Sequence, residues 1–417
     1  MESKKRVVVL GAGFGGLAFC QAFRHPAAEI TLVDRQNHHL FQPLLYQVAT
    51  AGLSAAEIAQ PIRSILRDRT DLSVRLGNVE SILPTEKRVV VDGNSLPFDY
   101  LIFALGGRTS YFGHPEWEAF APGLKSLADA QRIRREVLLA FEQAENSLDP
   151  KEQQRLMTIV VIGGGPTGVE LAGACAELAQ HVLRQDFRRI DPGQTRVILI
   201  EGSHHILGQF PETLGIRGEE QLKALGVEIR CGTLVREISQ GTVTLQSGEV
   251  IEAGNILWAA GVSASPLTAA LGAPRDRAGR VQVRPDLSIP DHPSIFVIGD
   301  AIALVDPNGV TVPGVSPAAI QAGQHVARIL ESELDARPRR VPFRYWDKGS
   351  MATIGRSAAV AKMGPLEFSG YPAWLAWLFV HLIFLIGFRN RVAVLWQWFY
   401  SYLTYKRGAR IITGLKW

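Results

Sequence analysis

The sequence contains little cysteine. Only Cys20, Cys175 and Cys231 occur among 417 residues, far apart and with no CxxC pair and no Cys/His cluster. Zinc sites and dithiol redox pairs need thiols at short spacing, so the sequence predicts neither, and it predicts no disulfide framework. We expect the three thiols to be small buried apolar side chains, because free cysteine is usually buried. We also expect the protein to lie in a reducing compartment.

Acidic residues are absent from the last fifty positions, because Glu367 is the final carboxylate. Six cations lie there, so with a formal net charge of +4 the preceding part carries 4 − 6 = −2. These cations are Arg389, Arg391, Lys406, Arg407, Arg410 and Lys416. Five of the eight Trp and four of the eight Tyr share this stretch, a composition typical of a membrane–water boundary. The rest of the chain has no Lys/Arg stripe, so no nucleic-acid partner is expected.

The tail also lacks an apolar run long enough to cross a bilayer easily. Residues 373–388 are uncharged, but sixteen helical residues span roughly 24 Å against about 30 Å of hydrocarbon. We expect Arg389–Arg391 to close this helix and residues 392–405 to form a second one, followed by cations for anionic headgroups. Two amphipathic helices in one leaflet are favoured; a tilted span and a buried dimer interface are the alternatives.

Glycine-rich loops follow two apolar strand patterns about one domain length apart. The strand at 7–10 leads into GAGFGG at 11–16, and the strand at 159–162 leads into GGGPTG at 163–168. Such glycines permit a tight turn and let backbone N–H groups approach a pyrophosphate, whose charge is stabilised at the N-terminus of the next helix. The repeat therefore predicts two dinucleotide sites.

An acid ends the next strand in each half. Asp34 follows the apolar residues 30–33, and Glu201 follows 197–200. A carboxylate there can accept hydrogen bonds from both hydroxyls of an adenosine ribose and repels a 2′-phosphate, so NADH is preferred to NADPH. The alternative is that both acids merely face solvent.

The repeat continues with a buried strand and small residues at 99–107 and at 255–261. A late strand at 295–298 ends in Gly299-Asp300, whose acid can bond a ribitol hydroxyl of a flavin. The expected fold class is α/β, with two Rossmann-like dinucleotide-binding domains and a C-terminal amphipathic helical membrane anchor.

These motifs resemble the two-dinucleotide-binding flavoproteins of the disulfide reductase superfamily, and within it type II NADH dehydrogenase. Four segments carry the closer resemblance: residues 37–49, 165–170, 316–323 and 348–356. The resemblance implies an FAD domain at 1–115 and 290–345, an NADH domain inserted at 150–285, and a C-terminal region at 346–417 with anchoring helices at about 372–412.

By the resemblance, the chain is a respiratory NADH:quinone oxidoreductase with FAD as cofactor, and it does not pump protons. The partners are a lipid-soluble quinone, the membrane surface and, through the tail, a second copy. The expected place is the cytoplasmic face of the inner membrane. The rivals are another flavin reductase with a ferredoxin-type or sulfide-linked acceptor, and a membrane-bound flavoprotein that signals to a protein partner.

The resemblance also assigns nucleotide contacts to individual residues. For FAD these are Gly11, Gly13, Phe14, Gly15, Gly16, Asp34, Gln42, Pro43, Val79, Ala104, Gly106, Gly299, Asp300 and Ala318. For NADH they are Gly163, Gly165, Pro166, Thr167, Gly168, Glu170, Glu201, Ala260 and Gly261.

Three residues are candidates for roles near the reacting groups. The resemblance places Glu170 beside nicotinamide and flavin. Without the resemblance, the simpler interpretation is that its negative charge near the start of a helix compensates the helix dipole. Gln321 keeps the second glutamine of the family's quinone signature AQxAxQ, while Pro317 replaces the first. Lys348 can place a cation near the flavin or the quinone. For Gln321 and Lys348 the alternative is an exposed polar side chain.

Overall fold

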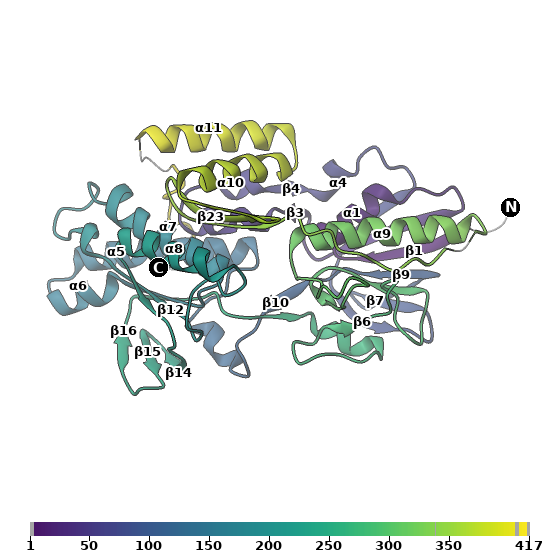
Figure 1. Cartoon of the computed structure of the whole chain (residues 1–417), viewed down its shortest axis with the longest axis horizontal. Coiled ribbons are helices and arrows are strands. Elements are labelled where there is room, and N and C mark those ends of the chain that lie inside the picture. The colour runs from purple at the N-terminus through teal and green to yellow at the C-terminus, as the bar shows by residue number, and fades with distance from the viewer. Residues whose placement is uncertain (1–3, 338, 405–407, 415–417) are drawn as a thin grey trace. The chain divides into compact units, whose positions relative to one another are not determined.

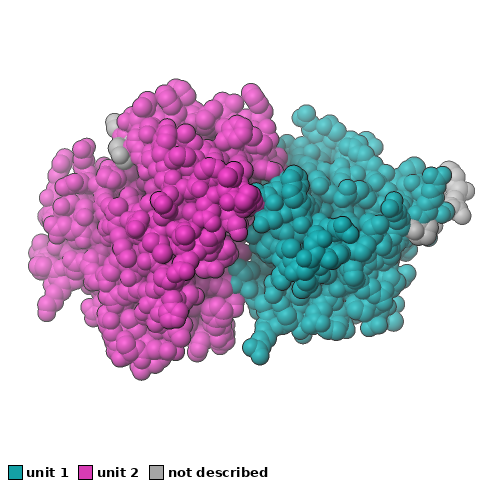
Figure 2. All heavy atoms as spheres, in the orientation of Figure 1, with its two compact units in different colours: residues 1–39, 60–108, 262–348 teal, residues 40–59, 109–261, 349–417 magenta. Residues whose placement is uncertain are grey.

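The structure, a computed structural model, describes residues 4–337, 339–404 and 408–414 (Figure 1). Its chain divides into two compact units, each made of three stretches. Unit 1 comprises residues 1–39, 60–108 and 262–348, and unit 2 comprises residues 40–59, 109–261 and 349–417 (Figure 2). The α/β class predicted from the repeated strand–glycine–helix pattern is confirmed, because each unit is built on a parallel sheet.

Unit 1 contains a five-stranded sheet in the order β20-β9-β1-β2-β5, with every neighbouring pair parallel. Its strands are β1 (Lys5–Leu10), β2 (Ala28–Asp34), β5 (Leu72–Leu76), β9 (Tyr100–Phe103) and β20 (Ile295–Val297). The run Val7–Leu10 is fully buried, as expected for a strand covered on both faces. The late strand β20 pairs with β9, so a distant stretch of chain completes this sheet.

Two helices of unit 1 pack against each other, α1 (Phe14–Ala22) and α9 (Ser316–Leu334). They approach closely because Gly323 has no side chain: an added Cβ would lie 2.3 Å from the backbone oxygen of Gly15. The remaining elements of this unit are α4 (Ile62–Ile65), the antiparallel β6 (Val79–Leu83), β7 (Arg88–Val91) and β8 (Asn94–Pro97), β18 (Val262–Ala264), and the pair β19 (Val281–Gln282) and β21 (Ile302–Ala303). The chain passes between units at β3 (His38–Leu40), β4 (Ala59–Pro61) and β10 (Gly107–Thr109).

Unit 2 contains a four-stranded parallel sheet in the order β13-β12-β11-β17. Its strands are β11 (Thr158–Ile162), β12 (Arg196–Ile200), β13 (Val227–Arg230) and β17 (Asn255–Trp258). Around it lie α5 (Leu127–Asn146), α6 (Pro150–Leu156), α7 (Pro166–Glu177), α8 (Glu212–Ala224) and the antiparallel strands β14 (Val235–Ser239), β15 (Thr242–Leu245) and β16 (Val250–Glu252).

The C-terminal region adds a second sheet to unit 2. Strands β22 (Ser350–Gly355), β23 (Ala358–Met363) and β24 (Leu366–Ser369) are antiparallel, and β22 packs on α7. Gly173 of α7 makes this contact possible, because a Cβ there would lie 1.7 Å from the backbone oxygen of Ile354. Helix α10 (Tyr371–Phe384) covers β23, while α2 (Leu45–Ala49) packs against α5 and α7.

The tail forms the two expected helices, but the break between them is not where the charges predicted it. Helix α10 ends at Phe384, after which Leu385 is extended and Gly387 has φ +89°. Helix α11 (Phe388–Thr404) begins there and contacts α10 and α3 (Ala55–Ile58). The prediction that Arg389–Arg391 closes the first helix was therefore wrong, since the backbone is already extended at Leu385 and passes through the left-handed Gly387 before α11 begins.

Among the described residues, no helix combines the length and the apolar character needed to cross a bilayer. Within the expected helical stretch at about 372–412, the described residues are helical over α10 and α11, and residues 408–414 form no helix. Lys406 and Arg407 lie outside the described residues. Arg410 forms an ion pair with Asp186 of the same unit, so the expected cation at 410 is bound to the protein itself.

Candidate functional site

The first glycine loop follows β1 in unit 1 and is folded too tightly for side chains. Gly11 has φ +96°, and an added Cβ would lie 2.4 Å from the backbone oxygen of Ala104. At Gly16 a Cβ would lie 1.9 Å from the Gly11 oxygen. Gly13, which caps α1, instead has open space where its Cβ would be. The loop thus leaves the start of α1 open to an anionic group such as a pyrophosphate.

Asp34 closes this loop from the end of β2. Its Oδ2 accepts a hydrogen bond from the Ala12 N–H at 2.6 Å, and its Oδ1 accepts one from the Gln36 N–H at 2.7 Å. A carboxylate has about four acceptor positions, so each oxygen keeps capacity for a ribose hydroxyl. The same group therefore holds the loop and offers a nucleotide contact.

The other residues assigned to FAD in unit 1 lie where the sheet strands end. Ala104 follows β9, with its N–H bonded to the Leu10 oxygen at 2.8 Å. Gly106 and Gly299 have φ +64° and +75°. Asp300 follows Gly299 and is half-buried, and Ala318 lies buried in the first turn of α9. Carboxyl ends of neighbouring parallel strands share one edge of a sheet, which is where such folds bind nucleotides.

Three assigned residues lie apart from this edge or in the other unit. Val79 is buried at the start of β6, in the antiparallel sheet of unit 1. Gln42 and Pro43 form a 3₁₀ turn before α2 in unit 2, where the Gln42 amide donates to the Lys125 oxygen at 3.2 Å. Their assignment to FAD stays a prediction.

His39 supports the first glycine loop and was not predicted as a site residue. Its Nδ1 lies 2.9 Å from the Ala12 oxygen, and since a carbonyl only accepts, this nitrogen carries the hydrogen. Burial lowers the pKa of His39, so the ring is neutral. Phe14, assigned to FAD, packs edge-to-face on it with ring centroids 5.0 Å apart. The His-His pair at 38 and 39 was the available sequence signal.

The second glycine loop, in unit 2, repeats the first in atomic detail. Gly163 has φ +109°, and a Cβ there would lie 2.6 Å from the Ala260 nitrogen. At Gly168 a Cβ would lie 1.8 Å from the Gly163 oxygen, while Gly165 caps α7 with open space beside it. This loop is therefore also folded for an approaching anionic group, walled by the segment after β17.

Glu201 accepts the same two kinds of backbone hydrogen bond as Asp34. Its Oε2 accepts from the Gly164 N–H at 2.6 Å and its Oε1 from the Ser203 N–H at 2.7 Å. Both acids thus bind the second residue of their glycine loop and the residue two positions further along the chain, past the end of the strand. The alternative that they merely face solvent is wrong, because both hold backbone groups.

Three further residues assigned to NADH surround this loop. Pro166 opens α7, Thr167 is exposed in its first turn, and Gly261 has φ +82°. The Phe112 ring lies against Gly261, where a Cβ would be 2.6 Å from its Cζ. Phe112, itself at φ +51°, was not predicted from the sequence.

Glu170 lies on α7 one turn beyond the second glycine loop, directed at the C-terminal sheet. The Thr353 N–H donates to its Oε1 at 3.4 Å. Burial raises the pKa of Glu170 to about 8, although the Thr353 N–H and the Trp377 indole both act to lower it. The Trp377 N–H, itself buried, approaches the carboxyl without reaching hydrogen-bond geometry. A carboxyl in this state holds a proton at neutral pH and can release it.

Glu170 opens into an apolar cavity of about 460 Å³ within unit 2. Residues of α2, α7, β22, α10 and α11 line it. Its aromatic lining consists of Tyr46, Trp374, Trp377, Phe379, Trp398, Phe399 and Tyr402. Leu375, Phe379, Leu395 and Phe399 line it and are also between 45% and 66% exposed, so its mouth opens on the outer face of the two tail helices. Such a cavity suits a flat apolar molecule with a few polar atoms.

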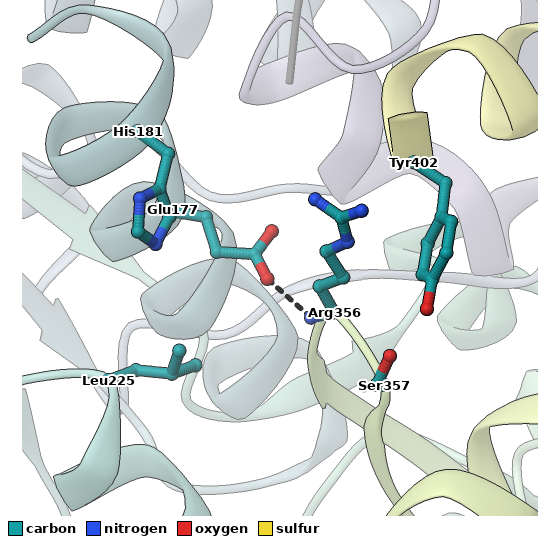
Figure 3. Close-up of a pocket in the computed structure, with 6 residues that line it drawn as sticks. All are labelled: Glu177, His181, Leu225, Arg356, Ser357 and Tyr402. Carbon is teal, nitrogen blue, oxygen red and sulfur yellow. Dashed lines mark hydrogen bonds between the residues drawn. The ribbon is translucent and has the colours of Figure 1, made fainter. Parts of the chain in front are cut away.

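A smaller polar cavity of about 380 Å³ adjoins the apolar one, because Glu177, Arg356 and Tyr402 line both (Figure 3). The Arg356 N–H donates to Glu177 Oε1. The Arg356 guanidinium carbon lies 4.0 Å from the Tyr402 ring centroid, a cation–π contact. Glu177 lies seven residues after Glu170 on the same face of α7, so one carboxyl group accepts from the backbone of β22 and the other from the turn that follows it.

Gln321 and Lys348 lie in unit 1, whereas Glu170 belongs to unit 2. The Gln321 amide binds the backbone of Trp346 twice, donating to its oxygen and accepting from its N–H, both at 3.0 Å. The Lys348 ammonium lies 5.4 Å from the Trp346 ring centroid. The two predicted residues therefore meet at Trp346.

The cysteines form no redox pair. All three are free thiols; Cys20 and Cys175 are buried, as predicted, while Cys231 is only partly buried. Burial raises the pKa of Cys20 to about 12, which keeps it protonated and unreactive. Among the described residues, no group of His, Cys, Asp and Glu is arranged to hold a metal ion.

Comparison with known proteins gives matches along almost the whole chain. Residues 5–323 match the pyridine nucleotide-disulphide oxidoreductase family, and residues 347–406 match the NDH2 C-terminal domain. Two proteins of Mycobacterium tuberculosis are similar: type II NADH:quinone oxidoreductase Ndh, 46% identical with 98% of this chain and 90% of that protein covered, and NdhA, 42% identical with 99% and 90% covered. The structure of NDH2 from Plasmodium falciparum in complex with NADH superposes with a TM-score of 0.90, covering 99% of this chain and 100% of that one. At 19% identity this last likeness concerns the fold alone.

Proposed function

The chain belongs to the type II NADH:quinone oxidoreductases, and from this membership we propose how its residues divide the work. It is an FAD-dependent enzyme that oxidises NADH and reduces a quinone without pumping protons. When bound, FAD supplies the chemistry by accepting a hydride from NADH and giving two electrons to the quinone. The protein binds the nucleotides, shapes the quinone site and holds a proton.

FAD is assigned to unit 1, within the predicted stretches 1–115 and 290–345. The residues present fit a dinucleotide: Gly13 leaves open space at the start of α1, and both oxygens of Asp34 retain acceptor capacity. Asp300 lies at the same strand edge for a ribitol hydroxyl. Lys348 supplies positive charge within this unit, and Gln321 holds the Trp346 segment beside it.

NADH is assigned to unit 2, within the predicted stretch 150–285. Gly163, Gly165 and Gly168 form its pyrophosphate loop, and Glu201 binds the adenosine ribose. The carboxylate of Glu201 would repel a 2′-phosphate, so NADH is favoured over NADPH.

The quinone is assigned to the apolar cavity of unit 2, and this cavity carries the proposal. Its aromatic lining accepts a flat ring, and its exposed apolar mouth offers entry to a lipid-soluble molecule. Reduction of a quinone consumes two protons as well as two electrons. Glu170 lies in the cavity wall, and its raised pKa of about 8 leaves a proton available there.

The tail helices are assigned to a membrane surface. Phe379 of α10 and Phe388, Val392 and Leu403 of α11 are each at least half exposed. With the cavity mouth on the same face, a bilayer covering these helices would deliver quinone directly. The enzyme would then lie in one leaflet on the cytoplasmic side, where NADH is found.

Removing residues 368–417 tests this assignment. The full chain is expected to float with lipid vesicles and the truncated chain to remain in solution. Flotation of the truncated chain would contradict it, and a detergent-free dimer formed only by the full chain would show that a second copy covers the face. NADH oxidation by inverted but not by right-side-out membrane vesicles would support the cytoplasmic side.

A cavity-filling variant tests the quinone assignment. Leu378 lines the cavity, and Leu378→Trp would place an indole inside it. In anaerobic stopped flow, NADH is expected to bleach the flavin at the normal rate, while reoxidation by a short-chain quinone slows at least tenfold. Leu403→Trp on the exposed face of α11 is the matched control, with both steps unchanged. Normal reoxidation in Leu378→Trp would overturn the assignment.

A further inference from the structure

Gln47 on α2 lines the apolar cavity and is held in one orientation by two hydrogen bonds. Its Oε1 accepts from the indole N–H of Trp398 at 2.8 Å, and its Nε2 donates to the Tyr46 hydroxyl at 2.8 Å. An indole N–H can only donate, so Trp398 fixes which end of the amide is oxygen. The amide nitrogen therefore has a fixed position.

An amide nitrogen carries two hydrogens, and only one of them is used. Among the residues that the structure describes, the second N–H of Gln47 has no hydrogen-bond acceptor. Gln47 is only partly buried on the wall of the apolar cavity, so this N–H can reach a ligand that supplies an acceptor.

The surroundings of Gln47 contain a second unused donor. The Trp377 ring lies between the partners of the amide, with centroids 6.4 Å from Tyr46 and 5.7 Å from Trp398. Its own N–H is buried without a hydrogen-bond partner, close to the Glu170 carboxyl. Two N–H donors and one protonated carboxyl thus gather in an aromatic cavity. An apolar ring with carbonyl oxygens matches this set better than a hydrocarbon does.

Gln321, the glutamine that keeps its place in the family's quinone signature, does not line this cavity. Its amide oxygen and nitrogen each bind the backbone of Trp346 in unit 1. Of these two glutamines, Gln47 is the one that lines the cavity.

We propose that Gln47 donates a hydrogen bond to a carbonyl oxygen of the quinone and that Trp398 positions it; this rests on the proposed assignment of the quinone to the cavity. The step served is the conversion of two carbonyls to two hydroxyls. NADH supplies two electrons and one hydrogen as hydride, and water supplies the second proton, which Glu170 can hold, so that NADH, one proton and quinone give NAD⁺ and quinol. Gln47 keeps its own proton and stabilises the negative charge that grows on the oxygen.

The test measures the two half-reactions of the purified holoenzyme in detergent. In Gln47→Leu, flavin reduction by NADH should be unchanged and kcat/KM for a short-chain quinone should fall about 10- to 100-fold, as expected for a lost hydrogen bond to a developing charge. Trp398→Phe keeps a ring but releases the amide, and a smaller fall is expected. Trp396→Phe, an exposed indole of the same helix outside the cavity lining, is the control and should leave both steps unchanged.

Two readouts separate this role from a structural one. Gln47→Glu keeps an acceptor for Trp398 but lacks the donor, so it should be as slow with quinone as Gln47→Leu; rescue by this variant would show a structural role. Ferricyanide has no carbonyl, and its reduction should be normal in every variant. If Gln47→Leu lowers the melting temperature, the quinone kinetics of Trp398→Phe decide whether Gln47 acts on the quinone, because this variant keeps Gln47 and only releases its amide.

Wild-type quinone kinetics in Gln47→Leu and Trp398→Phe, with Leu378→Trp still blocked, would overturn the role of Gln47 and leave the cavity assignment standing. Normal quinone kinetics in Leu378→Trp would remove the assignment on which the role rests.

Discussion

Two glycines of α7 should separate the two halves of the reaction. At Gly168 an added Cβ would lie 1.8 Å from the backbone oxygen of Gly163, in the nucleotide loop. At Gly173 it would lie 1.7 Å from the backbone oxygen of Ile354, in the wall of the apolar cavity. Gly168→Ala and Gly173→Ala are thus the same chemical change on one helix, directed at different sites.

The geometry sets the size of the effect at Gly173. A Cβ essentially never lies within 3.0 Å of another heavy atom, so β22 must move by at least 3.0 − 1.7 = 1.3 Å. The bonds from Thr353 to Glu170 and from Arg356 to Glu177 would break. At about 0.5–1.5 kcal/mol for the bond to the protonated Glu170 and about 1.5–3 kcal/mol for the bond to the Glu177 carboxylate, offset by about 1 kcal/mol of helix propensity, the free energy of unfolding falls by about 1–3.5 kcal/mol. The melting temperature should fall on the order of 5 °C.

Each half-reaction can be measured without the other. NADH bleaches the oxidised flavin, and a short-chain quinone reoxidises flavin that dithionite has reduced. Gly168→Ala should slow the first reaction at least tenfold and leave the second intact. Gly173→Ala, assayed well below its melting temperature, should do the reverse. If both variants slow the same half-reaction, the assignment of loop and cavity to different substrates is wrong.

Three further predictions follow from single carboxyl groups. Glu201→Arg removes the ribose acceptor and adds a cation, so kcat/KM for NADH should fall at least tenfold while the NADPH to NADH ratio rises; an unchanged ratio in steady-state assays would contradict the ribose contact. The pKa of Glu170 is raised from 4.5 to about 8, so between pH 4.5 and about 8 the native state binds one more proton than the unfolded state. The free energy of unfolding therefore falls as the pH rises through this window, by at most about 1.36 × 3.5, or 5 kcal/mol. Denaturant unfolding of Glu170→Gln should match wild type near pH 4.5 and exceed it above pH 8; parallel pH profiles would refute the buried proton. Asp34→Asn turns one acceptor oxygen into a donor that faces a backbone N–H, so FAD should dissociate at least tenfold more readily, measured by flavin fluorescence; full retention of FAD would show that Asp34 is not a nucleotide contact.

Local features of the fold were readable from the sequence because their causes are local. The strand–glycine–helix pattern located both glycine loops, and the acid after the next strand located Asp34 and Glu201. What the pattern could not give was their bonding, since the contacts with Ala12 and Gly164 depend on strands folding side by side. The end of α10 at Phe384 was missed because charge, and not backbone conformation, was used to end the helix.

The cavity could not be read from the sequence because five separate elements build it. Its wall depends on Gly173, whose importance appears only when β22 lies on it, and nothing in residues 350–369 indicated that sheet. Glu170 was selected, but through a resemblance; its burial and raised pKa come from the C-terminal sheet and α10. Gln47 belongs to the segment 37–49 that carries the family resemblance, but the sequence assigned it no role because its hydrogen-bond partner Trp398 is 351 positions away.

The most direct test of the central claim is to label the quinone site. Holoenzyme in detergent would be irradiated with a quinone carrying a photoreactive azide, digested, and the labelled peptides identified by mass spectrometry. Assignment of the quinone to the unit 2 cavity predicts label on peptides from α2, α10 and α11, lost when unlabelled quinone competes. Competable label confined to unit 1, for example around residues 316–323, would contradict it.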